Sequence, residues 1–155
     1  MAEFRKIETG KLLCLEETGP YRELNGLFTR LADYLNARGV STRGDRMAIV
    51  YEDPLKASQD RMHYAAALEL AGEVTGDGEM TVVVQPAGWV ACETHQGSYS
   101  TIQETYDRLF KWVQEHGYRV TGPAREYYID GRGPGSGDES QAVTEIHLPV
   151  EKTEV

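Results

Sequence analysis

The two halves of this chain carry matching residues at a constant spacing of 78 positions, the distance from Cys14 to Cys92. Glycines and aromatic residues stay in step along most of each half. The matched pairs are Cys14 and Cys92, Gly19 and Gly97, Tyr21 and Tyr99, Phe28 and Tyr106, Arg30 and Arg108, Leu31 and Leu109, Tyr34 and Trp112, Leu35 and Val113, Gly39 and Gly117, and Gly44 and Gly122. Such a duplication favours a fold of two similar halves that meet at a central site.

The chain has 155 residues, enough for one domain with a buried apolar core. We expect a single domain over residues 1–155, made of two pseudo-symmetric repeats at about 5–71 and 80–152. An acidic, glycine-rich connector at 71–79 joins them. A second, separate domain is not expected at this length.

Each repeat has the pattern strand, helix, strand, strand. In both expected helices apolar residues recur at helical spacing, and Gly39 and Gly117 follow them. Ser100 and Gln103 have the spacing of a capping box before the second helix, and the glycine-rich segment 131–141 predicts a loop without packed structure. These patterns predict an α+β fold: an antiparallel sheet with two long helices on one face and a central groove between pseudo-symmetric halves.

The chain is acidic, with a formal net charge of −9 and a pI near 4.9. It shows no cluster of Lys and Arg, so nucleic acid and anionic membranes are excluded as partners. A neutral or cationic partner fits better, and solubility alone also accounts for the acidic residues. No apolar run is long enough to span a bilayer and the N-terminus is not a signal peptide, which predicts a cytoplasmic location.

Cys14 and Cys92 hold equivalent places in two apolar, strand-like stretches. We therefore expect two buried, reduced thiols rather than a disulfide or a metal pair. The four histidines are scattered, and no spacing of Cys and His resembles a metal site. No nucleophile motif and no phosphate-binding loop occurs either. The residues thus indicate no cofactor and no metal ion.

Alternation along the last expected strand assigns its faces. The apolar residues within 146–150 should face the helices, so Glu145 and His147 should face the opposite side. The repeat alignment pairs Glu145 with Ala65. One half of the expected site therefore has a carboxylate, and the other half has a small side chain that leaves space for a ligand. Glu145 is then either a solvated residue or a carboxylate at the base of a groove, where it attracts a cation or acts as a general acid or base. His147 is either a proton carrier or a surface imidazole.

Aromatic residues are available to line such a groove. Tyr128 follows Glu126 by two residues and shares its strand face, and Trp89 can project toward the same place. Tyr51 fits a groove, the core or a sheet edge equally well. The aromatic residues at helical spacing, Tyr106 among them, are expected to pack in the core. The repeat symmetry breaks near the expected site at three pairs, Glu145 with Ala65, Tyr128 with Val50, and Trp89 with Lys11.

Several short segments, in a fixed order, span nearly the whole chain. They are Gly19-Pro20-Tyr21, Pro86-Ala87-Gly88, His95-Gln96-Gly97-Ser98-Tyr99, the run GPAREYYID at 122–130 and the run TEIHLPVE at 144–151. In this order and spacing they resemble the GyrI-like small-molecule binding family. The same domain serves as the effector module of AraC- and MerR-type multidrug regulators.

The resemblance implies a groove that binds lipophilic, often cationic compounds around a buried glutamate, which corresponds to Glu145, with a tyrosine that corresponds to Tyr128. Ligand binding is our leading hypothesis, with Tyr128 and Trp89 as walls of the groove. Ala65 departs from the family pattern, in which an acidic residue is frequent at that position, and this weakens a two-carboxylate mechanism.

The resemblance also implies two alternatives. Similar members hydrolyse cyclopropane-bearing cytotoxic compounds with a carboxylate and aromatic residues of the groove. Glu145 and Tyr128 would then be the catalytic residues. Other members protect gyrase by binding it, which would make this chain a protein-interaction module. The sequence carries no helix-turn-helix segment, so we expect no direct contact with DNA.

Overall fold

The computed structural model describes residues 1–129, 133–135 and 137–153, and in these the chain forms nine strands, all paired antiparallel, and two long helices. The helices are α1 (Leu24–Ala37) and α2 (Ile102–Glu115), preceded by the 3-10 turns η1 (Tyr21–Glu23) and η2 (Tyr99–Thr101). The strands are β1 (Glu3–Ile7), β2 (Gly10–Gly19), β3 (Thr42–Val50), β4 (Met62–Leu70), β5 (Met80–Gln85), β6 (Gly88–Gln96), β7 (Tyr118–Val120), β8 (Ala124–Tyr128) and β9 (Val143–Lys152). The predicted α+β fold is confirmed.

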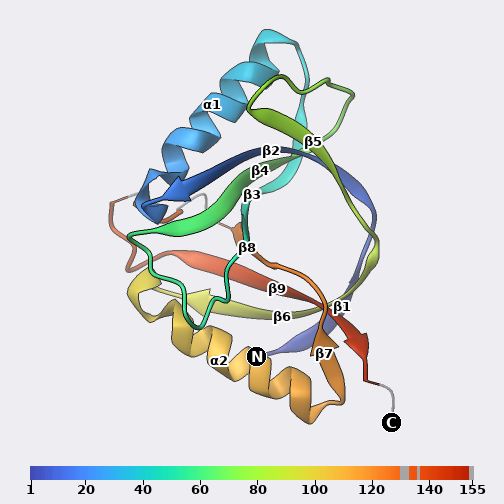
Figure 1. Ribbon diagram of the computed structural model, residues 1–155, viewed down its shortest axis with the longest axis vertical. Helices are drawn as coiled ribbons and strands as arrows, with labels where there is room; N and C mark the ends of the chain where they lie inside the picture. Colours follow the sequence, from blue (N-terminus) through green and yellow to red (C-terminus); the bar gives the residue numbers. More distant parts are fainter. Residues whose placement is uncertain (130–132, 136, 154–155) are drawn as a thin grey trace.

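The strand order in the sheet is β1-β6-β9-β8-β3-β4-β2-β5, and β7 pairs with β9 outside this path. The order is symmetric about the central pair β8–β3. The edge strands are exchanged, because β1 precedes β2 but pairs with β6, and β5 precedes β6 but pairs with β2. Figure 1 shows α1 and α2 on the same side of the sheet, one at each end. The central strands therefore lie between the two helices.

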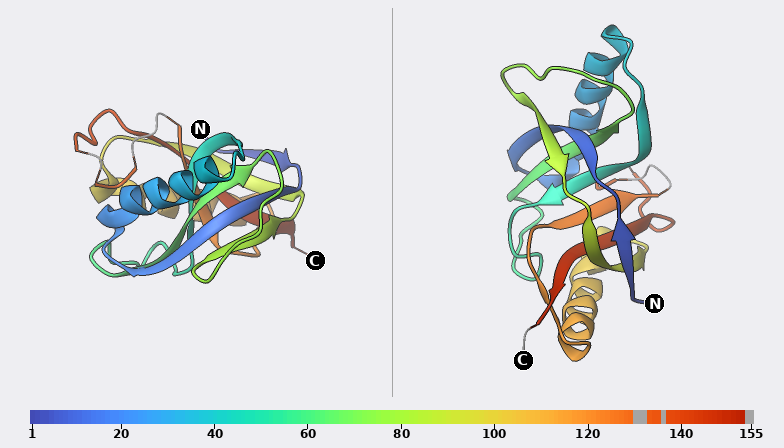
Figure 2. Two further views of the ribbon diagram at one scale, coloured as in Figure 1. Left: turned by 90° about the horizontal axis from the view of Figure 1, so that it is seen from above. Right: turned by 90° about the vertical axis from the view of Figure 1, so that its right-hand side faces the viewer.

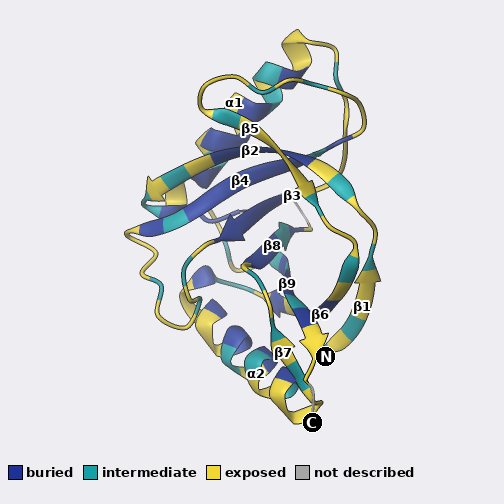
Figure 3. Cartoon of the chain, turned by 45° about the vertical axis from the view of Figure 1, so that its right-hand side comes forward, coloured by how far each residue is buried: buried dark blue, intermediate teal, exposed yellow. Residues whose placement is uncertain are grey.

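The main apolar core lies between the helices and one face of the sheet, which we call the helix face. The stripes of both helices bury against alternate strand residues, as their spacing predicts. The apolar row of β9 joins this core, so the face assignment of that strand is confirmed. In Figure 3 the buried residues follow the central strands and the inner sides of the helices.

The opposite face of the sheet, which we call the helix-free face, carries a second and smaller apolar cluster. The right panel of Figure 2 shows the segments from β1 to β2 and from β5 to β6 crossing in front of the central strands on this side. Ala65 belongs to the cluster and is completely buried, so the room expected beside it is already filled. The members are Leu12, Cys14, Met47, Ile49, Ala65 and Ala67, with Tyr127 packed against them.

Several local features match the predictions from the sequence, and others differ from them. Gly39 and Gly117 follow α1 and α2 with φ angles of 68° and 77°, a conformation that glycine adopts without strain. The predicted capping box is wrong, because Ser98 caps η2 and accepts a bond from the backbone N–H of Ser100, while Gln103 donates to the Ala57 carbonyl. Strands β1 and β7 were not predicted. Both cysteines are buried and free, as predicted.

The glycine-rich segment is a loop where the structure describes it, as predicted, but its start is packed against the core. Gly133 and Pro134 are buried, and a Cβ added to Gly133 would meet Asn25 of α1. Gly135 has a φ of +81°, and a Cβ there would lie 2.3 Å from the carbonyl oxygen of Arg22. The rest of the prediction, at 131, 132 and 136, lies outside the described residues. Neither helix in the described ranges is long and apolar enough to cross a membrane.

Candidate functional site

A buried carboxylate, Glu126, lies on the helix face of β8 and is enclosed by tyrosine hydroxyls. Glu126 is 2% exposed. Tyr21 donates to its Oε1 at 2.8 Å, and Tyr106 donates to its Oε2 at 2.5 Å. The Tyr128 hydroxyl lies 3.1 Å from Oε1 and 2.6 Å from the Tyr21 hydroxyl. Each hydroxyl carries one proton, so one of these two tyrosines donates to the other and the relay ends on the carboxylate.

The three tyrosines come from different elements. Tyr21 opens η1 just before α1, and Tyr106 lies on the inner side of α2. Tyr128 follows Glu126 by two residues and therefore shares its face of β8. Strand β8 pairs with β3 and β9 at the centre of the sheet, where the elements of both halves converge. Glu126 is thus held by contacts from both halves of the chain.

The hydrogen-bond donors of the carboxylate in the described part of the chain are neutral phenols. Burial raises the pKa of Glu126, and the hydrogen bonds from the tyrosines oppose this rise. Burial also raises the pKa of each tyrosine well above its usual value, so all three remain donors at neutral pH. Within the described residues, no Lys, Arg or His forms an ion pair with Glu126. A buried carboxylate without a counter-ion is costly, and a cationic ligand would relieve that cost.

Further aromatic contacts hold these rings in place. The Tyr99 ring meets the Tyr128 ring edge to face with centroids 6.0 Å apart, and its hydroxyl accepts a bond from Thr144 at 2.8 Å. Tyr64 meets Tyr21 in the same way at 4.9 Å. Such T-shaped contacts are favourable for aromatic rings. The tyrosine hydroxyls are therefore positioned by packing as well as by the carboxylate.

A cavity of about 20 Å³ adjoins Glu126, Tyr21 and Tyr106. Residues 52–60, between β3 and β4, close it from outside, and we call them the cover segment. Gln59 of this segment donates to the Tyr99 carbonyl at 2.6 Å, and Gln103 of α2 donates to the Ala57 carbonyl at 2.9 Å. The C-terminal part of the cover segment is thus held to η2 and the start of α2 by two side-chain hydrogen bonds.

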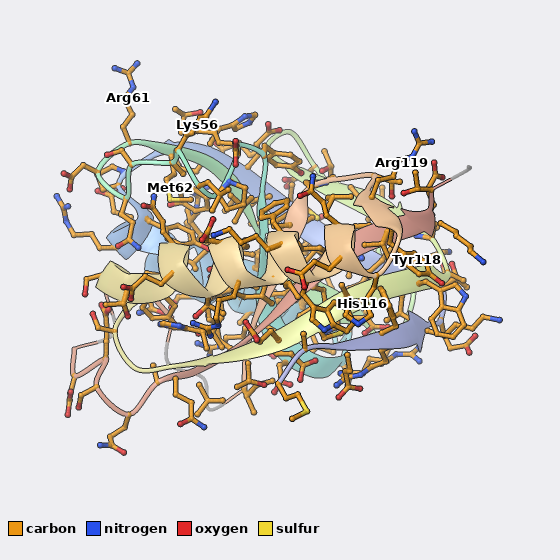
Figure 4. The ribbon with its side chains drawn as sticks, turned by 90° about the horizontal axis from the view of Figure 1, so that it is seen from below. Lys56, Arg61, Met62, His116, Tyr118 and Arg119 are labelled. Carbon is orange, nitrogen blue, oxygen red and sulfur yellow. The ribbon has the colours of Figure 1, made fainter. Side chains whose placement is uncertain are left out.

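A much larger groove, of about 1130 Å³, lies on the other side of the cover segment along α2. Val50 and Pro54 border both the groove and the small cavity. Figure 4 looks onto α2 and shows Lys56 and Met62 toward its N-terminal half, with Tyr118 and Arg119 at its C-terminal end. A displacement of the cover segment near Pro54 would join the two spaces.

The structure separates Glu145 from Tyr128. In the pairing of β8 with β9, Tyr128 lies opposite Thr144 and Tyr127 lies opposite Glu145. Side chains alternate between faces, so Glu145 lies on the helix-free face and Tyr128 on the helix face. The grouping of these two residues in one groove is wrong. Glu145 instead contacts Arg5 and His147, each at 2.6 Å.

The other sequence candidates divide between several places. His147 lies beside Glu145 on the helix-free face and is nearly completely buried. Trp89 is 52% exposed opposite Lys6 near the sheet edge and does not line the small cavity. Tyr51 is also largely exposed, stacks on His63 with centroids 4.8 Å apart and lines the outer groove. Only Glu126 and Tyr128, of the seven candidates, come together at the tyrosine cluster.

Sequence reasoning missed Tyr21 and Tyr106. Tyr106 was assigned to core packing because it lies at helical spacing, which is correct for its ring but neglects its hydroxyl. A signal was present, since the repeat pairs Tyr106 with Phe28 and so gives only one half a hydroxyl at that position. Buried tyrosine hydroxyls need partners, and this need indicates a polar group nearby.

The sequence profile of the GyrI-like small molecule binding domain matches residues 2–151. The chain belongs to the GyrI-like small-molecule binding domain family. No curated protein matches this GyrI-like domain in sequence at a significant level.

Solved structures share the fold of this GyrI-like domain. The C-terminal domain of EcmrR is 22% identical, with a TM-score of 0.84 over 99% of this chain and 98% of that one. In the EcmrR–DNA complex the identity is 21% and the TM-score is again 0.84, over 99% of this chain, which spans only 58% of the EcmrR chain. At these identities the likeness establishes the fold alone.

Two further solved structures share the fold at lower identity. A hydrolase encoded by lin2189 from Listeria innocua is 11% identical, with a TM-score of 0.72 over 97% of this chain and 91% of that one. SAV2435 was solved bound to tetraphenylphosphonium and is 14% identical, with a TM-score of 0.62 over 97% of this chain and 94% of that one. The fold thus occurs both in a protein described as a hydrolase and in one bound to a lipophilic cation.

Proposed function

We propose that this protein binds lipophilic, cationic small molecules on the helix face of its sheet, with Glu126 as the charge partner. The observation that carries the proposal is a carboxylate that is 2% exposed and has tyrosine donors but no ion pair with the described residues. A bound cation would supply the missing charge, and the tyrosine rings would contact its apolar and charged surface.

The SAV2435 structure supports the class of ligand, since the cation that it holds is both apolar and charged. The role that the sequence gave to Glu145 passes to Glu126 in this proposal. Tyr128 keeps its place beside the carboxylate, and Tyr21 and Tyr106 join it. Trp89 has no role, because its ring lies outside the site.

Access requires movement of the cover segment. The cavity of about 20 Å³ beside Glu126 is far smaller than the several hundred Å³ that drug-sized ligands occupy. The outer groove of about 1130 Å³ is large enough to receive the apolar part of such a ligand. The ligand would therefore enter through this groove and displace Pro54 and its neighbours to reach the carboxylate.

Calorimetric titration with tetraphenylphosphonium tests the proposal. Wild type should bind, and Glu126→Gln should bind about a hundredfold more weakly, because removing one member of a buried charge pair costs about 3 kcal/mol. Glu145→Gln is the matched control on the helix-free face and should bind as wild type does. Equal affinities of wild type and Glu126→Gln would contradict the proposal, as would a loss confined to Glu145→Gln.

A second candidate function is hydrolysis at the same carboxylate. Glu126 has a raised pKa and lies among phenol donors, which is the combination that a general base and a stabiliser of developing oxygen charge require. The hydrolase from Listeria innocua has the same fold, which supports this second candidate. Incubation with a cyclopropane-bearing alkylating compound, followed by mass spectrometry, should then give a hydrolysed product that Glu126→Gln does not form.

The acidic composition of the chain also supports the binding of a cation. With a net charge of −9, the chain repels phosphate backbones and attracts cations, which suits a cytoplasmic protein that takes up cationic compounds and does not itself contact nucleic acid. EcmrR was solved in a complex with DNA, but this protein spans only 58% of the EcmrR chain. The contact of EcmrR with DNA is therefore not carried over to this protein.

A further inference from the structure

The helix-free face holds a second group of chemically reactive side chains, Cys92, Glu145 and His147. Cys92 on β6 lies directly opposite His147 on β9, and Glu145 precedes His147 by two residues. All three side chains therefore project from the same face. Each offers one donor atom, and these atoms lie within 4.8 Å of one another. The described part of the chain contains no other group of three such residues.

A thiolate, an imidazole and a carboxylate are the three kinds of side chain that bind Zn²⁺. In a tetrahedral site, bonds of about 2.0 to 2.3 Å place neighbouring ligand atoms about 3.3 to 3.6 Å apart. The three donor atoms here lie within 4.8 Å of one another, so they have to move closer together to bind one ion. The strands that carry Cys92 and His147 are paired in register, so the required movement is one of side chains rather than of strands.

His147 provides a second and independent observation. It is 5% exposed, and its Nδ1 is buried without any hydrogen-bond partner. Its Nε2 lies 2.6 Å from Oε1 of Glu145. A buried imidazole normally uses both nitrogens, so the unpartnered Nδ1 of His147 needs an explanation. Coordination of a metal ion provides one.

Two arginines flank this group and bear on its charge. Arg5 of β1 donates to Oε1 of Glu145 at 2.6 Å, but its side chain is 42% exposed and can turn away into solvent. Arg125 of β8 lies opposite His147 and is buried. Arg5 therefore acts as the present cationic partner of Glu145, and an incoming ion has to replace it.

We propose that Cys92, His147 and Glu145 bind a divalent cation of the Zn²⁺ class, with a fourth position left to water. The Cys92 thiol releases its proton to solvent as its sulfur binds the ion, so the site takes up a metal and gives off a proton. The ion links β6 to β9 on the helix-free face. The site is separate from the Glu126 site, which lies on the helix face of the same sheet.

Cys14 supplies a matched control within the same chain. It holds the equivalent place on β2, and both thiols are buried and free. Burial raises the pKa of Cys14 and of Cys92 to about 12 in each case, so intrinsic reactivity does not distinguish them. The surroundings of the two thiols distinguish them, because Cys14 packs among apolar residues such as Ala67 and Met47, whereas Cys92 lies beside His147 and Glu145.

Titration of the full chain with Co²⁺ tests the site, since a thiolate bound to Co²⁺ gives a charge-transfer absorption in the near ultraviolet. Wild type and Cys14→Ser should show this band, and Zn²⁺ should remove it by competition. Cys92→Ser should lose the band. Glu145→Gln should weaken Co²⁺ binding more than about tenfold. Arg5→Gln should tighten it, because the competing cation is gone.

Absence of the band in wild type would overturn the proposal, and so would a band that Cys92→Ser retains. If Cys92→Ser does not fold, the partly exposed Glu145→Gln and Arg5→Gln variants decide, and unchanged Co²⁺ affinity in both would equally overturn it. Tetraphenylphosphonium binding should be the same with and without Zn²⁺. The two sites can therefore fail or succeed independently.

Discussion

The hydroxyl of Tyr106 on α2 lies 2.5 Å from Oε2 of Glu126 on β8. This contact joins a helix to the centre of the sheet through two fully buried polar groups. Neither group reaches solvent, so the Tyr106 hydroxyl and Oε2 of Glu126 satisfy each other, while Tyr21 donates to Oε1. Without the Tyr106 hydroxyl, Oε2 of the buried carboxylate would lose this hydrogen bond.

Tyr106→Phe should destabilise the fold by about 1 to 3 kcal/mol, the range for a buried hydrogen bond to a charged group. The ring and its packing stay, and only the donor is lost. Urea denaturation measures the difference. Tyr118→Phe is the control, because the Tyr118 hydroxyl makes no hydrogen bond with the described residues and its loss should cost almost nothing. Equal stability of Tyr106→Phe and wild type would show that the contact is not formed in solution.

Binding of a cation should weaken as the pH falls. Burial raises the pKa of Glu126, so the carboxyl becomes neutral at a higher pH than an exposed glutamate does. Above that pKa the carboxylate is ionised and attracts the cation, and below it the attraction is lost. The affinity for tetraphenylphosphonium, whose charge is fixed, should therefore drop as the pH falls, and the drop should begin at a higher pH than the titration of an exposed glutamate would give. Glu126→Gln should show a flat profile, and a wild-type profile just as flat would refute the charge role.

Gln103→Ala should speed ligand association. The Gln103 side chain donates to the Ala57 carbonyl and so holds the cover segment against α2. Without this bond the segment opens more often, and an opening step limits entry into a closed cavity. Stopped-flow fluorescence should show a faster on-rate in Gln103→Ala than in wild type. Glu115→Gln, at the end of α2 and outside the lining of the outer groove, is the control and should leave the rate unchanged.

Gly135→Ala should destabilise the fold more than Gly137→Ala. Both glycines have positive φ angles, +81° and +104°, so both substitutions carry backbone strain. At Gly135 the new Cβ would also meet the Arg22 carbonyl at 2.3 Å, whereas at Gly137 nothing lies within 4 Å. Thermal unfolding should place the melting temperature of Gly135→Ala clearly below that of Gly137→Ala. Equal temperatures would mean that the segment is not packed against η1.

The helices, the central strands and the face assignment of β9 were predictable because apolar periodicity is strong there. The partners across strands were not, because periodicity does not fix register. A shift of one residue in the β8–β9 pairing decides whether Glu145 or Thr144 faces Tyr128. Tyr106 shows a second limit of prediction from periodicity. A tyrosine at helical spacing can be a ring that only packs in the core or a ring whose hydroxyl also donates to a buried carboxylate, and the spacing does not distinguish the two. Strand β1 pairs with β6, which is far away in sequence, and no local sequence pattern indicates this pairing.

A crystal structure of the protein grown with tetraphenylphosphonium tests the role of Glu126 most directly. We predict that the cation lies on the helix face, in contact with Glu126 and the Tyr106 ring, with the cover segment displaced near Pro54. A cation on the helix-free face beside Glu145, or one confined to the outer groove with the Glu126 hydrogen bonds unchanged, would contradict it.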